Sequence, residues 1–392
     1  MGSWCALKID ELLLGSSKSY VDDVMLSIFH ERDRRIREIV VDPLTLESRT
    51  QYEYALSAES MRDRLDSLGF TVARARADYG VGHIEQQEIA RECLPTEDMH
   101  SLTRQTYDRW RQLISRSSKS VPLEVSADLA GFYSDLRLYL RGVLDALPGA
   151  AVVVLAYTDL VDGGYYSEAE PICLNARVKW AQDQPAYGPI VILTEGRSDA
   201  RILAAALNAM VPHLVDLFSF LDFASFNIEG GADTLVKTVR AFVAAGVTTR
   251  MVAIFDNDTA GTAAFTTLAG QPLPPNFRAM TLPRNSIGRQ YPTIGPQGLA
   301  IMDVNGLACS IELYLGQHSL QNDEGVLRPV RWTGYVAKMD RYQGAVEQKQ
   351  IIVERFFSNL ALCSSPSEVR ENFPDLATAV LQITSAFARP VS

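Results

Sequence analysis

Residues 190–283 alternate between short apolar segments and longer segments whose apolar residues recur at helical spacing. Strands that alternate with helices of this length are typical of a parallel sheet joined by right-handed crossovers. The first and third apolar segments, IVIL and MVAIF, have no polar residues, as expected when helices cover both faces of a sheet. We therefore predict an α/β fold. The expected strands are residues 190–195, 217–223, 250–258 and 277–283, and the expected helices are residues 198–211, 232–246 and 259–270.

A polar, proline-containing segment, residues 181–189, separates this pattern from a less regular first half. We predict an α+β N-terminal domain over residues 1–188 and the α/β domain over residues 189–318. Residues 319–392 are more polar and should form a small C-terminal tail that packs on the core. Within this tail, residues 346–361 have the spacing of an amphipathic helix, so we expect the tail to be helical.

Acidic residues follow two of the predicted strands. Glu195 ends the first, and Asp256, Asn257 and Asp258 end the third. The carboxyl ends of parallel strands share one edge of a sheet, so these acids can converge although about sixty residues separate them. Clustered oxygen ligands suit Mg²⁺ or Mn²⁺ better than zinc or copper. The alternative for an acid such as Asp258 is that it only caps the following helix, which is common after a strand.

The order Glu195, glycine, two residues, Asp199, followed later by Asp256-x-Asp258, resembles the Toprim fold. The resemblance covers residues 190–315 and is nearest to the nuclease branch related to the overcoming-lysogenization-defect proteins. It implies a Rossmann-like sheet and a divalent-metal-dependent nuclease that cleaves phosphodiester bonds of DNA or RNA. The catalytic acids would be Glu195, Asp256 and Asp258. The ligands of Mg²⁺ or Mn²⁺ would be Glu195, Asp199, Asp256, Asp258 and Glu312.

The opening of the chain, MGSWCALKIDELLLGSSKSYVDD, resembles the N-terminal module called HEPN/Toprim-associated, and residues 331–356 are similar to the tail that accompanies it. The resemblance implies a bacterial protein of antiphage defence. An alternative interpretation of the chain is a HEPN ribonuclease, because the spacing of Arg76 and His83 satisfies the loose Arg-to-His motif of those enzymes. The two glycines between them argue against the continuous helix that the motif requires.

The net charge of −10 disfavours a protein that coats nucleic acid indiscriminately, but it allows a nuclease with a local basic groove. Three arginines lie in or near the expected catalytic edge and could grip a phosphate, although ordinary loop charge is the alternative that we favour. These candidate nucleic-acid-binding residues are Arg197, Arg284 and Arg289. A second basic group, residues 104–119, interleaves arginines with Tyr107 and Trp110. It could stack on bases, although we favour a solvated helix face there.

The chain lacks a basic and apolar leader, an apolar run of about 18 residues, and paired cysteines. We therefore expect a cytoplasmic protein without a membrane partner. Nucleic acid is the expected partner, while a protein partner from the same defence system and a homo-oligomer both stay open. The alternative to a nuclease is a non-catalytic Toprim-like sensor or scaffold that binds nucleic acid or a partner without turnover.

Overall fold

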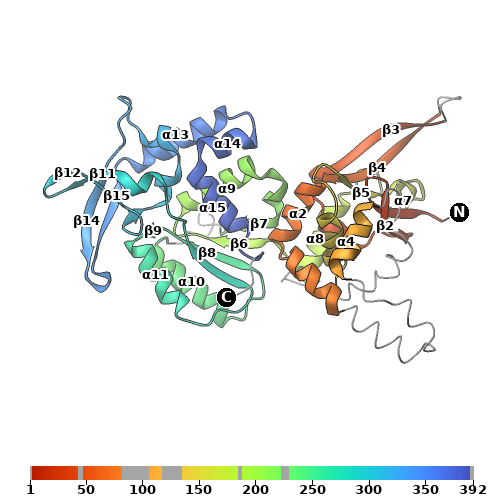
Figure 1. The fold of residues 1–392 in the computed structure, drawn as a ribbon, viewed down its shortest axis with the longest axis horizontal. Helices are drawn as coiled ribbons and strands as arrows, with labels where there is room; N and C mark the ends of the chain where they lie inside the picture. The colour runs from red at the N-terminus through yellow and green to blue at the C-terminus, as the bar shows by residue number, and fades with distance from the viewer. Residues whose placement is uncertain are drawn as a thin grey trace. The chain divides into compact units, whose positions relative to one another are not determined.

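The computed structural model describes residues 2–42, 47–81, 106–116, 135–183, 188–221 and 229–388. The chain forms two compact units, Met1–Gln184 and Pro185–Ser392 (Figure 1). Within the described ranges, no helix combines the length and the apolar character that a membrane crossing needs. His83, the second residue of the weighed HEPN motif, lies outside the described residues.

The first unit is built on an antiparallel sheet of five strands in the order β2-β1-β5-β4-β3. Its core includes β5, whose Val153 and Leu155 are fully buried, and the helix α4, whose Tyr107 and Trp110 face inward. The strands are β1 (Trp4–Ile9), β2 (Leu12–Lys18), β3 (Arg34–Asp42), β4 (Glu47–Ser57) and β5 (Val152–Ala156). The helices are α1 (Asp23–Ser27), η1 (Glu31–Asp33), α2 (Ala58–Ser67), α4 (Tyr107–Arg116), α6 (Leu136–Asp145), α7 (Thr158–Asp162) and α8 (Ile172–Asp183).

The second unit is built on a parallel sheet of four strands in the order β10-β8-β6-β7. From β6 the chain moves outward to β7, and it then returns past β6 to β8 and β10 on the other side. The strands are β6 (Ile190–Leu193), β7 (Phe218–Phe220), β8 (Met251–Phe255) and β10 (Phe277–Thr281). The helices between them are α9 (Arg197–Met210), η5 (Pro212–Leu217), α10 (Ala232–Ala244) and α11 (Thr259–Ala269).

Alternate residues of a strand point to opposite faces of the sheet, so apolar side chains on both faces of this parallel sheet need helices to cover them. The side chains of Phe255 and Phe277 join a buried cluster with α10 and α11, which contact each other. The helix α9 instead contacts α14 (Pro366–Asn372) and α15 (Pro374–Thr384) from the end of the chain. The predicted α/β class and parallel sheet are confirmed, and the predicted helices correspond to α9, α10 and α11.

A second sheet follows in the chain, with strands in the order β12-β11-β14-β15. Its strands are β11 (Tyr291–Gly295), β12 (Gly298–Met302), β14 (Val330–Val336) and β15 (Arg341–Val346). Short elements join it to the parallel sheet: β9 (Asn257–Asp258), η6 (Ile287–Gln290), β13 (Ala308–Cys309), η7 (Ile311–Tyr314), α12 (Gln317–Leu320) and η8 (Ala337–Met339). The helix α13 (Lys349–Leu362) begins soon after β15 and includes most of the segment predicted to be an amphipathic helix. The prediction of a helical tail over residues 319–392 is wrong for its first part, because β14 and β15 pair with each other and extend the sheet of β11 there.

Candidate functional site

Glu195 and Asp256 lie at the point where the strand order of the parallel sheet reverses. Glu195 follows β6 and Asp256 follows β8, and these two strands are hydrogen-bonded neighbours. Ligands of open parallel sheets bind at such a switch point, beyond the carboxyl ends of the strands. The two residues are in contact, because Glu195 Oε1 accepts a hydrogen bond of 2.9 Å from the backbone N–H of Asp256.

Two glycines allow the backbone to close around this pair. A Cβ atom on Gly230 would lie 2.7 Å from the carbonyl oxygen of Glu195. A Cβ atom on Gly261 would lie 2.3 Å from the carbonyl oxygen of Asp256 and 2.9 Å from Glu195 Oε1. Both positions therefore require glycine for close approach of the chain rather than for a turn.

Asp258 and Asp199 lie at the beginnings of helices. Asp258 is the N-cap of α11: its Oδ1 accepts from Gly261 N–H at 2.7 Å, and its Oδ2 accepts from Gln343 Nε2 at 2.7 Å. Asp199 lies in the first turn of α9, and Ser198 Oγ donates to it at 3.1 Å. Capping is thus a real role of Asp258, and Gln343 of β15 is a contact that sequence reasoning missed.

The fifth acid, Glu312, reaches the site from η7, a single 3₁₀ turn. The same turn approaches Asp256, whose Oδ1 accepts a hydrogen bond of 3.1 Å from Ile311 N–H. Glu312 is buried, and its Oε2 accepts from Ser310 Oγ at 2.5 Å and from Lys349 Nζ at 3.0 Å. A lysine among the acids was not foreseen.

Lys349 is the first residue of α13, and the residue before it has an unusual backbone conformation. Gln348 has φ 58° and ψ 41°, the left-handed region that few residues other than glycine adopt. Arg328 Nε donates to Gln348 Oε1 at 2.7 Å. Burial lowers the pKa of Lys349, but the nearby carboxylates, Glu312 first, outweigh burial and raise this pKa above its usual value. The lysine is therefore a cation held among acids.

The acids are close enough to alter one another's ionisation. Burial, followed by the charges of Asp258 and Asp199, raises the pKa of Glu195 to about 7. Burial, followed by the charge of Glu312, raises the pKa of Asp199 to about 6. Burial also raises the pKa of Asp256 well above its usual value, and each of the other four acids raises it further. Asp256 is thus the electrostatic centre of the cluster.

These five residues offer only oxygen, the donor that Mg²⁺ and Mn²⁺ prefer. As the side chains stand, no three His, Cys, Asp or Glu residues in the described ranges are arranged to hold a metal ion. Oxygens of three of the five acids instead accept hydrogen bonds within the protein. Glu195 accepts from Asp256 N–H, Asp258 accepts from Gln343, and Glu312 accepts from Lys349. A divalent cation would relieve the repulsion between the acids. The donor set therefore fits such an ion if the side chains turn away from their present donors.

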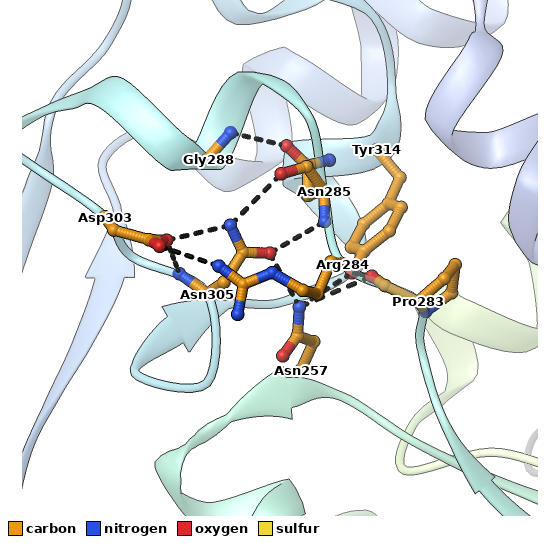
Figure 2. Close-up of polar contacts among 8 residues, drawn as sticks. All are labelled: Asn257, Pro283, Arg284, Asn285, Gly288, Asp303, Asn305 and Tyr314. Carbon is orange, nitrogen blue, oxygen red and sulfur yellow. Dashed lines mark hydrogen bonds and ion pairs between the residues drawn. The ribbon is translucent and has the colours of Figure 1, made fainter.

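Asn257, the middle residue of the triplet, anchors the site to the loop after β10 (Figure 2). Its Nδ2 donates to Asn305 Oδ1 at 2.9 Å and to the carbonyl oxygen of Pro283 at 3.3 Å. Asn305 Oδ1 also accepts from Asn285 N–H at 2.7 Å, and the fully buried Asn285 accepts from Gly288 N–H at 2.7 Å. This network fixes the backbone between the two aspartates, so the role of Asn257 in the structure is to position them.

The three arginines proposed from the sequence are all exposed. Arg197 begins α9, directly after the glycine that follows Glu195. Arg284 lies in the loop after β10 and forms an ion pair of 2.8 Å with Asp303, as Figure 2 shows. Arg289 lies in η6 and, like Arg197, forms no ion pair with another described residue. Two of the three guanidinium groups therefore have no competing carboxylate among the described residues.

The first unit can also be compared with known families. Residues 1–179 match the family model described as HEPN/Toprim N-terminal domain 1. The chain matches no curated protein and no solved structure. The family match covers nearly all of the first unit and none of the acidic site, and it supports the predicted HEPN/Toprim-associated domain over residues 1–179.

Proposed function

We propose that this chain is a divalent-metal-dependent nuclease with a Toprim-type catalytic unit. One observation carries the proposal: at the switch point of a parallel sheet, Asp256 contacts Glu195 through its N–H and contacts the turn that carries Glu312 through its Oδ1. Mutually repelling carboxylates are costly to gather, and a cation that binds a phosphodiester explains why they are gathered. The match of residues 1–179 to a HEPN/Toprim-associated domain supports the same class of function.

The residues have distinct proposed roles. Glu195, Asp256 and Asp258 would hold the principal ion, and Asp199 and Glu312 would help to hold a second. When bound, Mg²⁺ or Mn²⁺ supplies a more acidic water and stabilises charge on the phosphate oxygens. Glu195 would accept a proton from that water as a general base, a role that suits its raised pKa of about 7.

Lys349 would have one role without a cation and another with it. Its ammonium group now contacts Glu312 Oε2 at 3.0 Å and partly neutralises the acids. If Glu312 turned to hold a cation, this contact would be lost and the ammonium group of Lys349 would become available to a phosphate oxygen. The exposed Arg197, Arg284 and Arg289 would bind phosphates further along the substrate.

A cleavage assay with matched variants tests the proposal. Plasmid DNA, single-stranded DNA and RNA are each incubated with the protein in Mg²⁺, in Mn²⁺ and in EDTA. We expect cleavage with metal only, and a loss of roughly 100-fold or more in Glu195→Gln and Asp256→Asn. Glu324→Gln removes an exposed acid of the same unit and should cleave at the wild-type rate. Wild-type rates in both site variants would refute the assignment.

A second candidate is a non-catalytic sensor or scaffold. The bonding of Asp258 favours it, because both of its oxygens already have donors, Gly261 N–H and Gln343 Nε2. The ion pair between Glu312 and Lys349 favours it for the same reason. Calorimetric titration with Mn²⁺ separates the two functions. A binding module that needs no metal should release no heat that depends on Asp256.

The biological setting belongs to the proposal as well. The matched family is described as HEPN/Toprim N-terminal domain 1, and we propose a role in bacterial antiphage defence. Nucleic acid would be the substrate, and the first unit would sense the trigger or recruit a partner. Survival of cells challenged with phage, compared between the wild type and Asp256→Asn, tests this role directly. Equal survival would remove the defence assignment without affecting the chemistry.

A further inference from the structure

The second sheet of the second unit carries an aromatic pocket beside the acidic site. A cavity of about 330 Å³ lies between the β11–β12 hairpin and the side chains of Trp332 and Tyr342. This volume is at the small end of the range for ligand pockets, about 300–1,000 Å³, so it suits one small planar group. The remaining wall includes small residues, among them Gly295 and Ala300.

The aromatic side chains of the pocket lie on one face of the β14–β15 hairpin. The ring centroids of Trp332 and Tyr342 are 6.2 Å apart, and those of Tyr335 and Tyr342 are 5.2 Å apart. Tyr335 and Tyr342 are 52% and 59% exposed, so their rings are largely open to solvent. A Cβ atom on Gly295 would lie 3.3 Å from Trp332 Cδ1, so the indole packs on the glycine backbone and forms a flat wall. Exposed, pre-ordered aromatic faces are what an unpaired base stacks on.

The same strand connects the pocket to the acids. The carbonyl oxygen of Tyr342 accepts from Thr259 Oγ1 at 2.7 Å, in the first turn of α11. The next residue, Gln343, donates to Asp258 at 2.7 Å. Successive residues of a strand point to opposite sides. The strand therefore turns one side chain toward the acids and its neighbour toward the pocket.

The strand β15 also carries a positively charged side chain, Arg341. Arg341 is exposed and forms no ion pair with any residue of the described ranges. Its Nη1 lies 3.6 Å from where a Cβ atom on Gly306 would be, and Gly306 N–H bonds to the carbonyl oxygen of Asn257 at 2.9 Å. An unpaired guanidinium group that lies near Gly306, one residue before Tyr342, suits the phosphate that links a cleaved position to a stacked base.

We propose that the substrate is single-stranded nucleic acid, with an unpaired base next to the cleaved phosphate stacked against Trp332 and Tyr342. The inference rests on the proposed function, because it places that phosphate at the acids. A base in a duplex is already stacked and paired, and the pocket could receive it only after it is flipped out at a cost of a few kcal/mol. The pocket thus selects for unpaired strands.

Binding measurements with Asp256→Asn protein, which should not turn over substrate, test this inference. The probes are a fluorescent DNA of about 12 nucleotides, RNA of the same sequence, and the DNA duplex. We expect tighter binding of a single strand than of the duplex. Tyr342→Ala should weaken single-strand binding by about 5-fold to 150-fold, whereas Tyr342→Phe and Leu299→Ala should not change it. Equal affinity for strand and duplex, or no effect of Tyr342→Ala, would overturn the inference.

Ultraviolet crosslinking of the same strands to protein with an unaltered pocket does not depend on the folding of a variant. Peptide mass spectrometry should place the crosslinks on β14 and β15, and crosslinks confined to other segments would contradict the inference. The proposed nuclease function fails by a different result, which is absence of metal-dependent cleavage by the wild type. A protein that stacks single strands and does not cleave them would therefore keep the stacking of an unpaired base on Trp332 and Tyr342 and lose the catalytic proposal.

Discussion

Replacing Glu195 by glutamine should stabilise the metal-free protein, and the gain should depend on pH. The native pKa of Glu195 is about 7, against an ordinary value of 4.5. Below pH 4.5 the carboxyl group is protonated in both the folded and the unfolded chain, so its ionisation does not affect stability. As pH rises toward 7, the unfolded chain ionises first and native stability falls. The full cost, on the order of 3 kcal/mol, is present above pH 7.

Glutamine removes this cost and keeps an oxygen for the hydrogen bond from Asp256 N–H. Glu195→Gln should raise the free energy of unfolding of the second unit by about 3 kcal/mol at pH 8 and by under about 1 kcal/mol at pH 5. Unfolding in urea with EDTA can be read by hydrogen exchange of β8 peptides in a pulse of fixed pH, so that the signal reports this unit.

The control for this prediction is Glu324→Gln, which removes an exposed acid of the same unit and should change neither value. A gain from Glu195→Gln that is equal at pH 5 and pH 8 would refute the electrostatic reasoning. A loss of stability at pH 8 would show that the carboxylate is needed for packing, contrary to the crowding of acids described above.

Three further results are expected. Asn257→Ala deletes the donor to Asn305 and Pro283, so the free energy of unfolding measured in urea should fall by about 1–3 kcal/mol; an unchanged value would show that the network does not brace the site. Gly261→Ala should abolish Mn²⁺ binding in calorimetry, because its Cβ atom would lie 2.3 Å from a backbone oxygen, whereas Gly270→Ala, with 3.6 Å to the nearest atom, should bind normally. Mn²⁺ should bind about tenfold more tightly at pH 8 than at pH 6, because acids with raised pKa values must lose protons to bind metal; equal affinities would contradict the raised pKa values.

The parallel sheet could be predicted because its signal is local. Each strand and crossover helix has its own apolar pattern, and β6, α9, β8 and α11 lie where that pattern places them. The contact between Glu195 and Asp256 follows from the rule that neighbouring parallel strands end at one edge. The sequence pattern therefore predicted the strands and helices that frame the site, and it predicted that Glu195 and Asp256 lie close together.

Other parts of the site depend on contacts between distant segments. Gln343 and Lys349 meet the acids only because β15 and the start of α13 pack beside α11 and η7, and no local spacing signals this. The basic segment of the first unit shows the same limit. Tyr107 and Trp110 were considered as stacking residues, but the fold buries both in the core, with Trp110 fully inaccessible. Which face of a short helix is buried depends on its neighbours rather than on its composition.

The attachment of β15 and α13 to the acids has a practical consequence for dissecting this protein. A fragment trimmed to the alternating strands and helices, ending near residue 318, would retain all five carboxylates and would lose Gln343 and Lys349. Such a fragment would carry uncompensated negative charge at its rim. An inactive or insoluble fragment would therefore say little about the intact protein, and boundaries for expression are better chosen to include the last helices.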